Sequence, residues 1–376
     1  MDFNLTDEQQ MLRDSARRFV RERYGFEARR ALEQSDAGWS AEHWQTYAEL
    51  GWLALGLPEH AGGLGFGLTD TCLLTEALGQ GLVLEPFIST AVLCARILER
   101  AGDAALCTPL LGAVAGGELR LALAHEEPGV QHQRCAATTT ARRNASGYVL
   151  SGSKTMVLDA PSAHRFIVSA CVHDEPGLAL FLVDAQAPGL RLQPYTLIDG
   201  SRAGDLLLDG IELPPTALLV PQESGSEVLD EALDRATVAR VAEALGAMDA
   251  VLRITSDYLK TRQQFGQPIG KFQALQHRMA EMFVEVEATQ SILFQALACI
   301  DAAPVQRAAA VSVAKVVAAQ AGRFVGGQGI QLHGGMGMTA ECAVGHYFKR
   351  LVVIDRSYGD AEWHLQRMAA LRKHDD

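Results

Sequence analysis

Apolar positions in the first 118 residues recur at the spacing of amphipathic helices. Leu12, Ala16 and Phe19 lie four and three positions apart, and Thr6 with Gln9 forms a capping box ahead of them. Similar patterns follow in the ranges 44–52, 73–78 and 92–98. We therefore predict an α-helical N-terminal domain over residues 1–118.

Between residues 119 and 222 the pattern changes to short apolar segments separated by Gly, Pro, Asp and Ser. This spacing is typical of antiparallel strands, and Asp209-Gly210 between two apolar runs is a candidate tight turn. We predict a middle antiparallel β-domain over residues 119–222. The expected strand segments are 119–124, 148–158, 166–172, 178–183 and 205–213.

From residue 223 onward the helical period returns. Val241, Leu245, Met248 and Leu252 mark one helix face, and the range 305–325 is a further long helical pattern. Long helices joined by short loops favour a C-terminal four-helix bundle over residues 223–376. The predicted fold class is α+β, with the three domains in the order α, β, α.

Composition and charge narrow the class of protein. Of 376 residues, 48% are apolar and 21% are charged, as in a soluble protein with a large core. The net charge of −12 argues against nucleic acid as a partner, because such binding needs a basic surface.

Cysteine usage and apolar run length bear on the compartment. The seven cysteines are odd in number and contain no C-x-x-C spacing, so we expect reduced thiols, no metal site and a cytoplasmic location. No secretory signal is visible. Lys315 interrupts the longest apolar run before the ~18 residues that a membrane span needs. We therefore expect no membrane partner and a buried helix around this lysine.

The stretch Tyr258–Gln273, YLKTRQQFGQPIGKFQ, is the most informative part of the chain. Its Phe-Gly pair and its proline should end a helix and present Arg262, Phe265 and Gln273 around a turn. A guanidinium binds pyrophosphate through its planar fork and an aromatic ring stacks on another ring, so a large anionic aromatic cofactor would suit this group. A helix-turn-helix with a solvated arginine is the alternative reading.

A second motif, GIQLHGGMGM, follows at Gly329–Met338, where adjacent glycines allow close backbone approach. The two motifs together resemble the acyl-CoA dehydrogenase family, whose C-terminal domain carries R-x-x-F-G-x-x-I-x-x-x-Q and then Q-x-x-G-G-x-G. The ranges 5–20, 50–67 and 146–161 resemble other segments of that family, so the resemblance covers nearly the whole chain. It implies FAD as cofactor, held by Arg262, Phe265, Ile269, Gln273, Gln331, Gly334 and Gly335.

The resemblance implies α,β-dehydrogenation of an acyl-CoA thioester. A carboxylate removes the α-proton, hydrogen bonds polarise the thioester carbonyl, and FAD takes a hydride and passes electrons to an electron-transfer flavoprotein. In the family these FAD-binding elements act across a subunit interface on the neighbour's FAD. We therefore expect a homo- or hetero-oligomer, with a tetramer built as a dimer of dimers. The sequence does not identify the acyl chain.

The position of the base is ambiguous. The family's Glu in Y-E-G-T matches Asp360 when counted from the end of the chain and Gly359 when counted from Arg350. Asp360 is the candidate base, and an N-cap at a helix start is its alternative role. The other family position for a base is Ala236, and Glu243 further along that helix reads as a buried structural partner or a second candidate.

Several family positions hold other residues here. The Arg of L-D-x-x-R is Thr237, the Thr of Thr-Glu-Pro-Gly is Glu126, and the Trp-Ile-Thr element reads Met156-Val157-Leu158. In the family the last two elements contact the flavin ring, and a carboxylate near an electron-rich reduced flavin would be repulsive.

The chain thus keeps the elements that bind the ADP half of FAD and has lost several that bind the ring. It resembles the small subunits of heteromeric acyl-CoA dehydrogenases of the pimeloyl-CoA or sterol side-chain type, including the G-D-A-x-W-H-L ending. We expect an acyl-CoA dehydrogenase of fatty acid or sterol side-chain degradation, acting alone or as one subunit of a heteromer. A catalytically silent subunit that completes a partner's FAD site, and a flavin oxidase or monooxygenase, are the alternatives.

Overall fold

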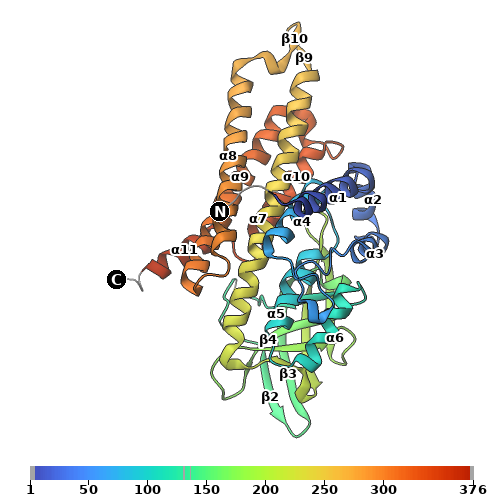
Figure 1. The fold of residues 1–376 in the computed structure, drawn as a ribbon, viewed down its shortest axis with the longest axis vertical. Coiled ribbons are helices and arrows are strands. Elements are labelled where there is room, and N and C mark those ends of the chain that lie inside the picture. The colour runs from blue at the N-terminus through green and yellow to red at the C-terminus, as the bar shows by residue number, and fades with distance from the viewer. Residues whose placement is uncertain (1–4, 130–131, 136, 373–376) are drawn as a thin grey trace. The chain divides into compact units, whose positions relative to one another are not determined.

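The computed structural model describes residues 5–129, 132–135 and 137–372 (Figure 1). The chain divides into two compact units. The first, called the helical unit, comprises Met1–Ala31, Leu68–Val83 and Thr237–Asp376; the second, called the sheet unit, comprises Leu32–Gly67 and Leu84–Ala236. The predicted boundaries at residues 118 and 222 divide the chain differently, and they stay a prediction.

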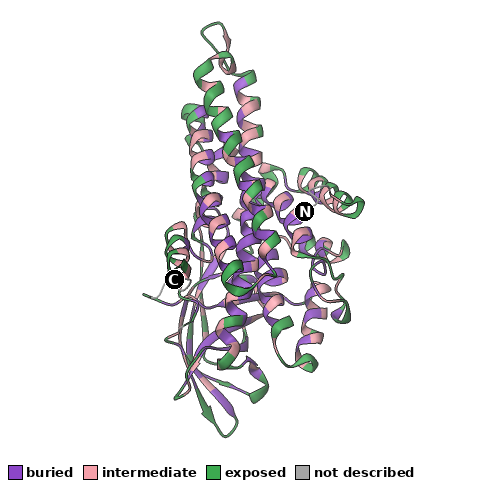
Figure 2. Cartoon of the chain, turned by 60° about the vertical axis from the view of Figure 1, so that its left-hand side comes forward, coloured by how far each residue is buried: buried purple, intermediate pink, exposed green. Residues whose placement is uncertain are grey.

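The helical unit contains the predicted bundle. Helices α7, α8, α9 and α10 lie side by side (Figure 1), and buried residues of all four helices belong to one hydrophobic core. Figure 2 shows buried positions along the bundle. The unit's helices are α1 (Asp7–Arg23), part of α2 (Phe26–Gln34), α4 (Leu68–Gln80), most of α7 (Gln222–Thr261), α8 (Gln273–Cys299), α9 (Pro304–His333), α10 (Ala343–Arg356) and α11 (Ala361–Arg372).

Particular residues account for two features of the helical unit. The capping box at α1 is confirmed, because the Thr6 hydroxyl accepts from Gln9 N at 3.2 Å and the Gln9 side chain accepts from Thr6 N at 3.1 Å. Helices α4 and α7 approach to backbone contact. A Cβ on Gly246 would lie 1.8 Å from the carbonyl oxygen of Glu76, so only glycine fits there.

The long apolar helix predicted around Lys315 is α9. An 18-residue window within Pro304–Met338 has a mean hydropathy of 1.3, and 67% of that window is buried. The Lys315 side chain is buried and its Nζ donates to the carbonyl oxygen of Ser357. This burial agrees with the expected core helix, because its apolar face packs inside the helical unit.

The sheet unit is built around an eight-stranded sheet in the order β6-β7-β3-β2-β4-β5-β8, with β1 pairing with β4. Its helices in the described chain are α3 (Ala41–Glu49), the π-helix η2 (Ile88–Cys94), α5 (Ala95–Arg100) and α6 (Ala104–Ala115). Its strands are β1 (Leu121–Ala124), β2 (Thr140–Asn144), β3 (Gly147–Leu158), β4 (Arg165–Val172), β5 (Ala179–Asp184), β6 (Leu190–Thr196), β7 (Arg202–Leu213) and β8 (Leu218–Val220).

The sheet is mainly antiparallel, and the predicted α+β class with a helical start, a middle β-region and a C-terminal bundle is confirmed. Two pairs, β1 with β4 and β2 with β4, are parallel. The tight turn predicted at Asp209-Gly210 is wrong, because β7 continues through it. Gly210 has a φ of 64°, and the pairing with β3 shifts between Leu150 and Gly152, so this glycine belongs to a β-bulge.

Candidate functional site

The first motif, Tyr258–Gln273, forms a hairpin after the end of α7. The helix ends at Thr261, and strands β9 (Gln263–Gln264) and β10 (Gln267–Pro268) pair around Phe265-Gly266. Both turn residues have positive φ, 53° for Phe265 and 76° for Gly266, as a two-residue hairpin requires. The predicted end of the helix and the turn are confirmed.

The hairpin presents its side chains outward. Phe265 is 90% exposed, and Arg262 and Gln273 are exposed as well. Ile269 is half-buried, and its N–H donates to the carbonyl oxygen of Arg262 at 2.9 Å. A phenylalanine so exposed in a left-handed conformation gains nothing from the core of this chain, which favours a role in binding.

The second motif lies at the end of α9. Gln331, Gly334 and Gly335 are exposed, and a Cβ on either glycine would meet nothing within 4 Å. The 3-10 helix η6 (Gly334–Met338) follows, with Met336 55% and Met338 78% exposed. The backbone of this segment is therefore open to a ligand or to another chain.

Contacts between α7 and α9 bring the two motifs to the same end of the bundle. The Tyr258 ring stacks on His333 with centroids 4.4 Å apart, and the Tyr258 hydroxyl donates to the carbonyl oxygen of His333 at 3.4 Å. Arg278 of α8 donates to Gln328 of α9 at 3.0 Å. Sequence reasoning gave no role to Tyr258 or His333, although each lies within one of the two motifs. We call the seven predicted cofactor residues the clamp: Arg262, Phe265, Ile269, Gln273, Gln331, Gly334 and Gly335.

Asp360 caps a helix. Its Oδ1 accepts from Trp363 N at 2.9 Å at the start of α11, and its Oδ2 accepts from Arg356 at 2.7 Å. Both carboxylate oxygens therefore have partners within the helical unit. The N-cap reading is confirmed, and the role of base stays a prediction.

Gly359 cannot carry the base. Its φ is 105°, and a Cβ there would lie 2.6 Å from Trp363 Cε3 and 2.9 Å from His364 Nε2. A glutamate at this position would require the turn and both rings to move. The structure thus accounts for the glycine at one of the two candidate base positions.

Glu243 is a buried structural partner. Arg240 donates to one of its oxygens at 2.7 Å, and Arg350 donates to the other at 2.6 Å. Burial raises the pKa of Glu243, but the two arginines outweigh burial and hold the pKa below its ordinary value. An ionised carboxylate shared by two guanidinium groups is poorly placed to take a proton from a substrate. The structural reading of Glu243 is confirmed.

The L-D-x-x-R region also forms internal contacts. Asp234 is buried and accepts from Arg134 at 2.7 Å, and Asp230 accepts from the same guanidinium at 2.9 Å. Thr237, at the family's arginine position, is buried.

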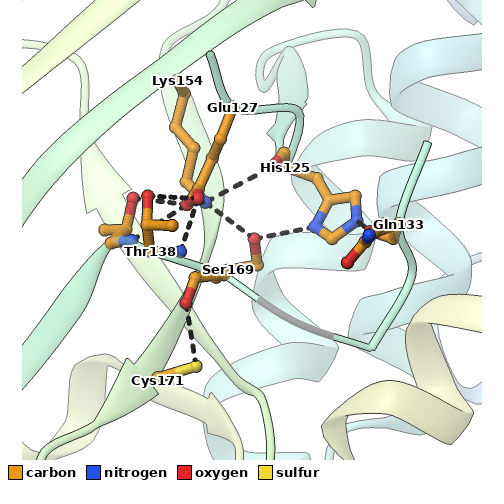
Figure 3. Close-up of polar contacts among 9 residues, drawn as sticks. His125, Glu127, Gln133, Thr138, Lys154, Ser169 and Cys171 are labelled. Carbon is orange, nitrogen blue, oxygen red and sulfur yellow. Dashed lines mark hydrogen bonds and ion pairs between the residues drawn. The ribbon is translucent and has the colours of Figure 1, made fainter. Parts of the chain in front are cut away.

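A buried polar network joins Glu127, Thr138 and Thr139 to side chains of strands β3 and β4 (Figure 3). Lys154 Nζ donates to Glu127 at 2.6 Å and to the Ser169 hydroxyl at 3.0 Å, and Glu127 also accepts from the Thr138 and Thr139 side chains. Ser169 Oγ lies 2.8 Å from His125 Nδ1. Burial raises the pKa of Glu127, but these hydrogen bonds, led by that of Lys154, hold its pKa at about 2. Burial and Lys154 lower the pKa of His125 to about 4.

These pKa values predict a loss of stability in acid. A histidine whose pKa falls from 6.5 to about 4 on folding stabilises the fold above pH 6.5, and this contribution of roughly 3 kcal/mol is lost as the pH falls to 4. Glu127 adds a second loss between pH 4.5 and 2. We expect the free energy of unfolding, measured in urea, to fall across both windows. His125→Asn should reduce the slope above pH 4.5, where His164, whose pKa burial also lowers, keeps a share, and should leave the slope below pH 4.5 in place. An unchanged upper slope would contradict the assignment to His125.

Comparisons with known proteins agree with the fold and the motifs. Three family descriptions match: the acyl-CoA dehydrogenase N-terminal domain at residues 6–118, the middle domain at 122–210 and the C-terminal domain at 223–371. The chain therefore belongs to the acyl-CoA dehydrogenase family. The expected enzyme class, an oxidoreductase of this family, is confirmed.

Solved relatives share the whole fold. A variant of the Tcur3481-Tcur3483 steroid ACAD is 35% identical, with a TM-score of 0.89 and 98% of both chains covered. The ChsE4-ChsE5 complex from Mycobacterium tuberculosis is 29% identical, with a TM-score of 0.91 and 99% of both chains covered. PigA, solved with FAD and proline, is 25% identical, with a TM-score of 0.90 over the full length of both chains. The expectation of FAD is thereby supported at the level of the family.

Proposed function

We propose that this chain is a subunit of a FAD-dependent acyl-CoA dehydrogenase, in which its clamp binds the ADP half of a FAD held by an adjoining chain. The enzyme removes hydrogen from the α and β carbons of an acyl-CoA thioester and passes electrons to an electron-transfer flavoprotein. The observation that carries this proposal is the clamp itself. Its guanidinium, aromatic ring and amides gather at one end of the bundle and face outward.

The chemistry of the clamp fits a dinucleotide. Arg262 can bind the diphosphate through two parallel hydrogen bonds, and Phe265 offers an open ring face for stacking. Gln273 and Gln331 supply amides, while Gly334 and Gly335 leave the backbone accessible. When bound, the flavin supplies a hydride acceptor. The clamp residues bind and orient the nucleotide, and a second chain would be needed to enclose it.

A heteromeric assembly is the form that we propose, with a second chain of the same fold as partner. The names Tcur3481-Tcur3483 and ChsE4-ChsE5 each join two components, and the first is described as a steroid ACAD. We therefore propose CoA esters with a sterol side chain or a ring as the substrate class, and a cytoplasmic tetramer as the assembly.

Asp360 remains our candidate base in this chain, and Asp360→Asn separates that role from the cap. Asparagine is as good an N-cap as aspartate, so we expect the melting temperature to change little. If Asp360 is the base, the maximal rate of the assembled enzyme should fall by at least about 100-fold, because the carboxylate that accepts the proton is gone. An unchanged rate would exclude Asp360 as the base.

A catalytically silent subunit is the second candidate function. The hydrogen bonds that already occupy the carboxylates of Asp360 and Glu243 favour it. Both Asp360 oxygens and both Glu243 oxygens accept hydrogen bonds inside the helical unit, and Gly359 has no room for a side chain. In that case the chain would complete the partner's FAD site and contribute no base.

The experiment is to purify the chain alone and with a candidate partner, and to add a sterol side-chain CoA ester without oxygen. We expect flavin bleaching by the complex, followed by reoxidation when electron-transfer flavoprotein is added. Stoichiometric flavin and full turnover in the lone chain would contradict the heteromer. A complex that carries flavin but is not bleached by any acyl-CoA would contradict the dehydrogenase.

A further inference from the structure

One exposed face of the sheet unit contains a residue, Met156, in a strained backbone conformation. Strand β3 departs from regular pairing with β7 between Lys154 and Val157, and within this bulge Met156 has a φ of 52° and is 45% exposed. The Met156 N–H donates to the Tyr195 hydroxyl and to Asp205 Oδ1, both at 3.1 Å. A left-handed methionine held in this way on a strand indicates a face with a specific use.

A carboxylate is held beside this bulge. The carbonyl oxygen of Glu126 accepts from Thr155 N at 2.8 Å, which places the residue next to Met156. The Glu126 side chain accepts from His132 N at 2.8 Å, and its other oxygen lies 3.3 Å from His132 Nδ1. Burial raises the pKa of Glu126, but the contacts with His132 outweigh burial and keep the pKa below its ordinary value.

These residues do not fit a flavin ring. The segments containing Glu126 and Met156 lie in the range that matches the family's middle domain, and they resemble the two elements that contact the ring in that family. The N5 nitrogen of the oxidised ring accepts a hydrogen bond, whereas an ionised carboxylate has no hydrogen to donate and the Leu158 side chain has no polar atom. Reduction makes the ring more electron-rich, so the charge on Glu126 would repel it. The clamp of this chain thus fits the ADP half of FAD, and this face does not fit the ring.

We propose that Glu126, oriented by His132, prevents a flavin ring from binding to this face of the chain. The chain then holds no flavin of its own, and its clamp binds the flavin of a neighbouring chain. This inference rests on the proposed function, in which the clamp binds the FAD of an adjoining chain. It adds that a specific pair of side chains excludes the ring and that the exclusion can be reversed.

The test measures FAD binding to the full chain without its partner, by equilibrium dialysis and by the visible spectrum of the bound flavin. The Glu126→Thr/Leu158→Thr variant removes the charge and places a hydroxyl at each position. We expect FAD to bind at least about tenfold more tightly to this variant than to the native chain, a ratio that corresponds to about 1.4 kcal/mol. Glu126→Gln, which keeps the shape and can still accept from His132 N, should give a smaller gain in the same direction.

A matched control changes a similar pair elsewhere in the sheet unit. His173 Nδ1 and Asp174 Oδ2 lie 2.7 Å apart on the surface, so His173→Ser/Asp174→Thr should leave FAD binding unchanged. Tight FAD binding by the native lone chain would overturn the inference, as would a folded Glu126→Thr/Leu158→Thr chain that binds no better than the native one. Restored binding that resists Arg262→Ala would support exclusion of the ring by Glu126 and contradict the clamp, so the two proposals fail separately.

Discussion

Replacing Lys154 by methionine should lower the free energy of unfolding by about 3–5 kcal/mol. Lys154 is buried, and its Nζ is the cation that faces the Glu127 carboxylate at 2.6 Å. Methionine fills much of the volume but leaves Glu127 as a buried charge without its counter-ion. The hydrogen bonds from Thr138 and Thr139 to Glu127 remain, which places the expected loss toward the lower end of that range.

Urea unfolding at pH 7, followed by circular dichroism, would measure this loss. Arg165→Met is the matched control, because Arg165 lies 3.9 Å from Asp184 on the surface and an exposed pair contributes only ~0–1 kcal/mol. The double variant Lys154→Met/Glu127→Gln should recover part of the stability, since no charge is then buried alone. Equal losses for Lys154→Met and Arg165→Met would show that the buried ion pair of Lys154 with Glu127 contributes no more stability than an exposed pair.

Replacing Arg262 by alanine should release FAD from the assembled enzyme while leaving the fold intact. A charge-assisted hydrogen bond to a phosphate contributes about 1.5–3 kcal/mol, so FAD binding should weaken by roughly 10- to 100-fold. Because Arg262 is exposed, the stability of the chain should change by less than about 0.5 kcal/mol. Phe265→Ala should also weaken FAD binding, because the ring is 90% exposed and its edge contact with Phe272 leaves most of the ring available for stacking.

Flavin content after gel filtration and the dissociation constant for FAD would check this prediction. Arg191→Ala, in β6 of the sheet unit, is the control, since Arg191 is also highly exposed but lies outside the clamp. Only this chain should carry the substitution while the partner stays native. Full flavin retention in such a complex would mean that this arginine does not bind the diphosphate.

Much of the fold could be predicted because its signals are local. The capping box at Thr6, the end of α7 before Phe265 and the long buried helix around Lys315 each depend on residues close in sequence. The turn at Phe265-Gly266 could also be predicted, because a Phe-Gly pair has a strong backbone preference, whereas the clamp residues came from the resemblance to the family and their role stays a prediction.

The remaining features depend on contacts between residues far apart in the chain. Asp209-Gly210 has the composition of a turn, but pairing with β3 makes it a bulge within β7. The lack of space at Gly359 depends on how α11 places Trp363. The roles of Glu243 and Asp360 were open in the sequence because a carboxylate reads alike as base, ion-pair partner or cap, and only its neighbours distinguish these roles.

The most direct test of the clamp is an experimental structure of the flavin-loaded assembly. We predict that the Arg262 guanidinium lies within hydrogen-bonding distance of the diphosphate of a FAD whose ring is held by an adjoining chain, with Phe265 packed against the same nucleotide. A clamp that faces solvent in that structure, with every FAD bound elsewhere, would contradict the account.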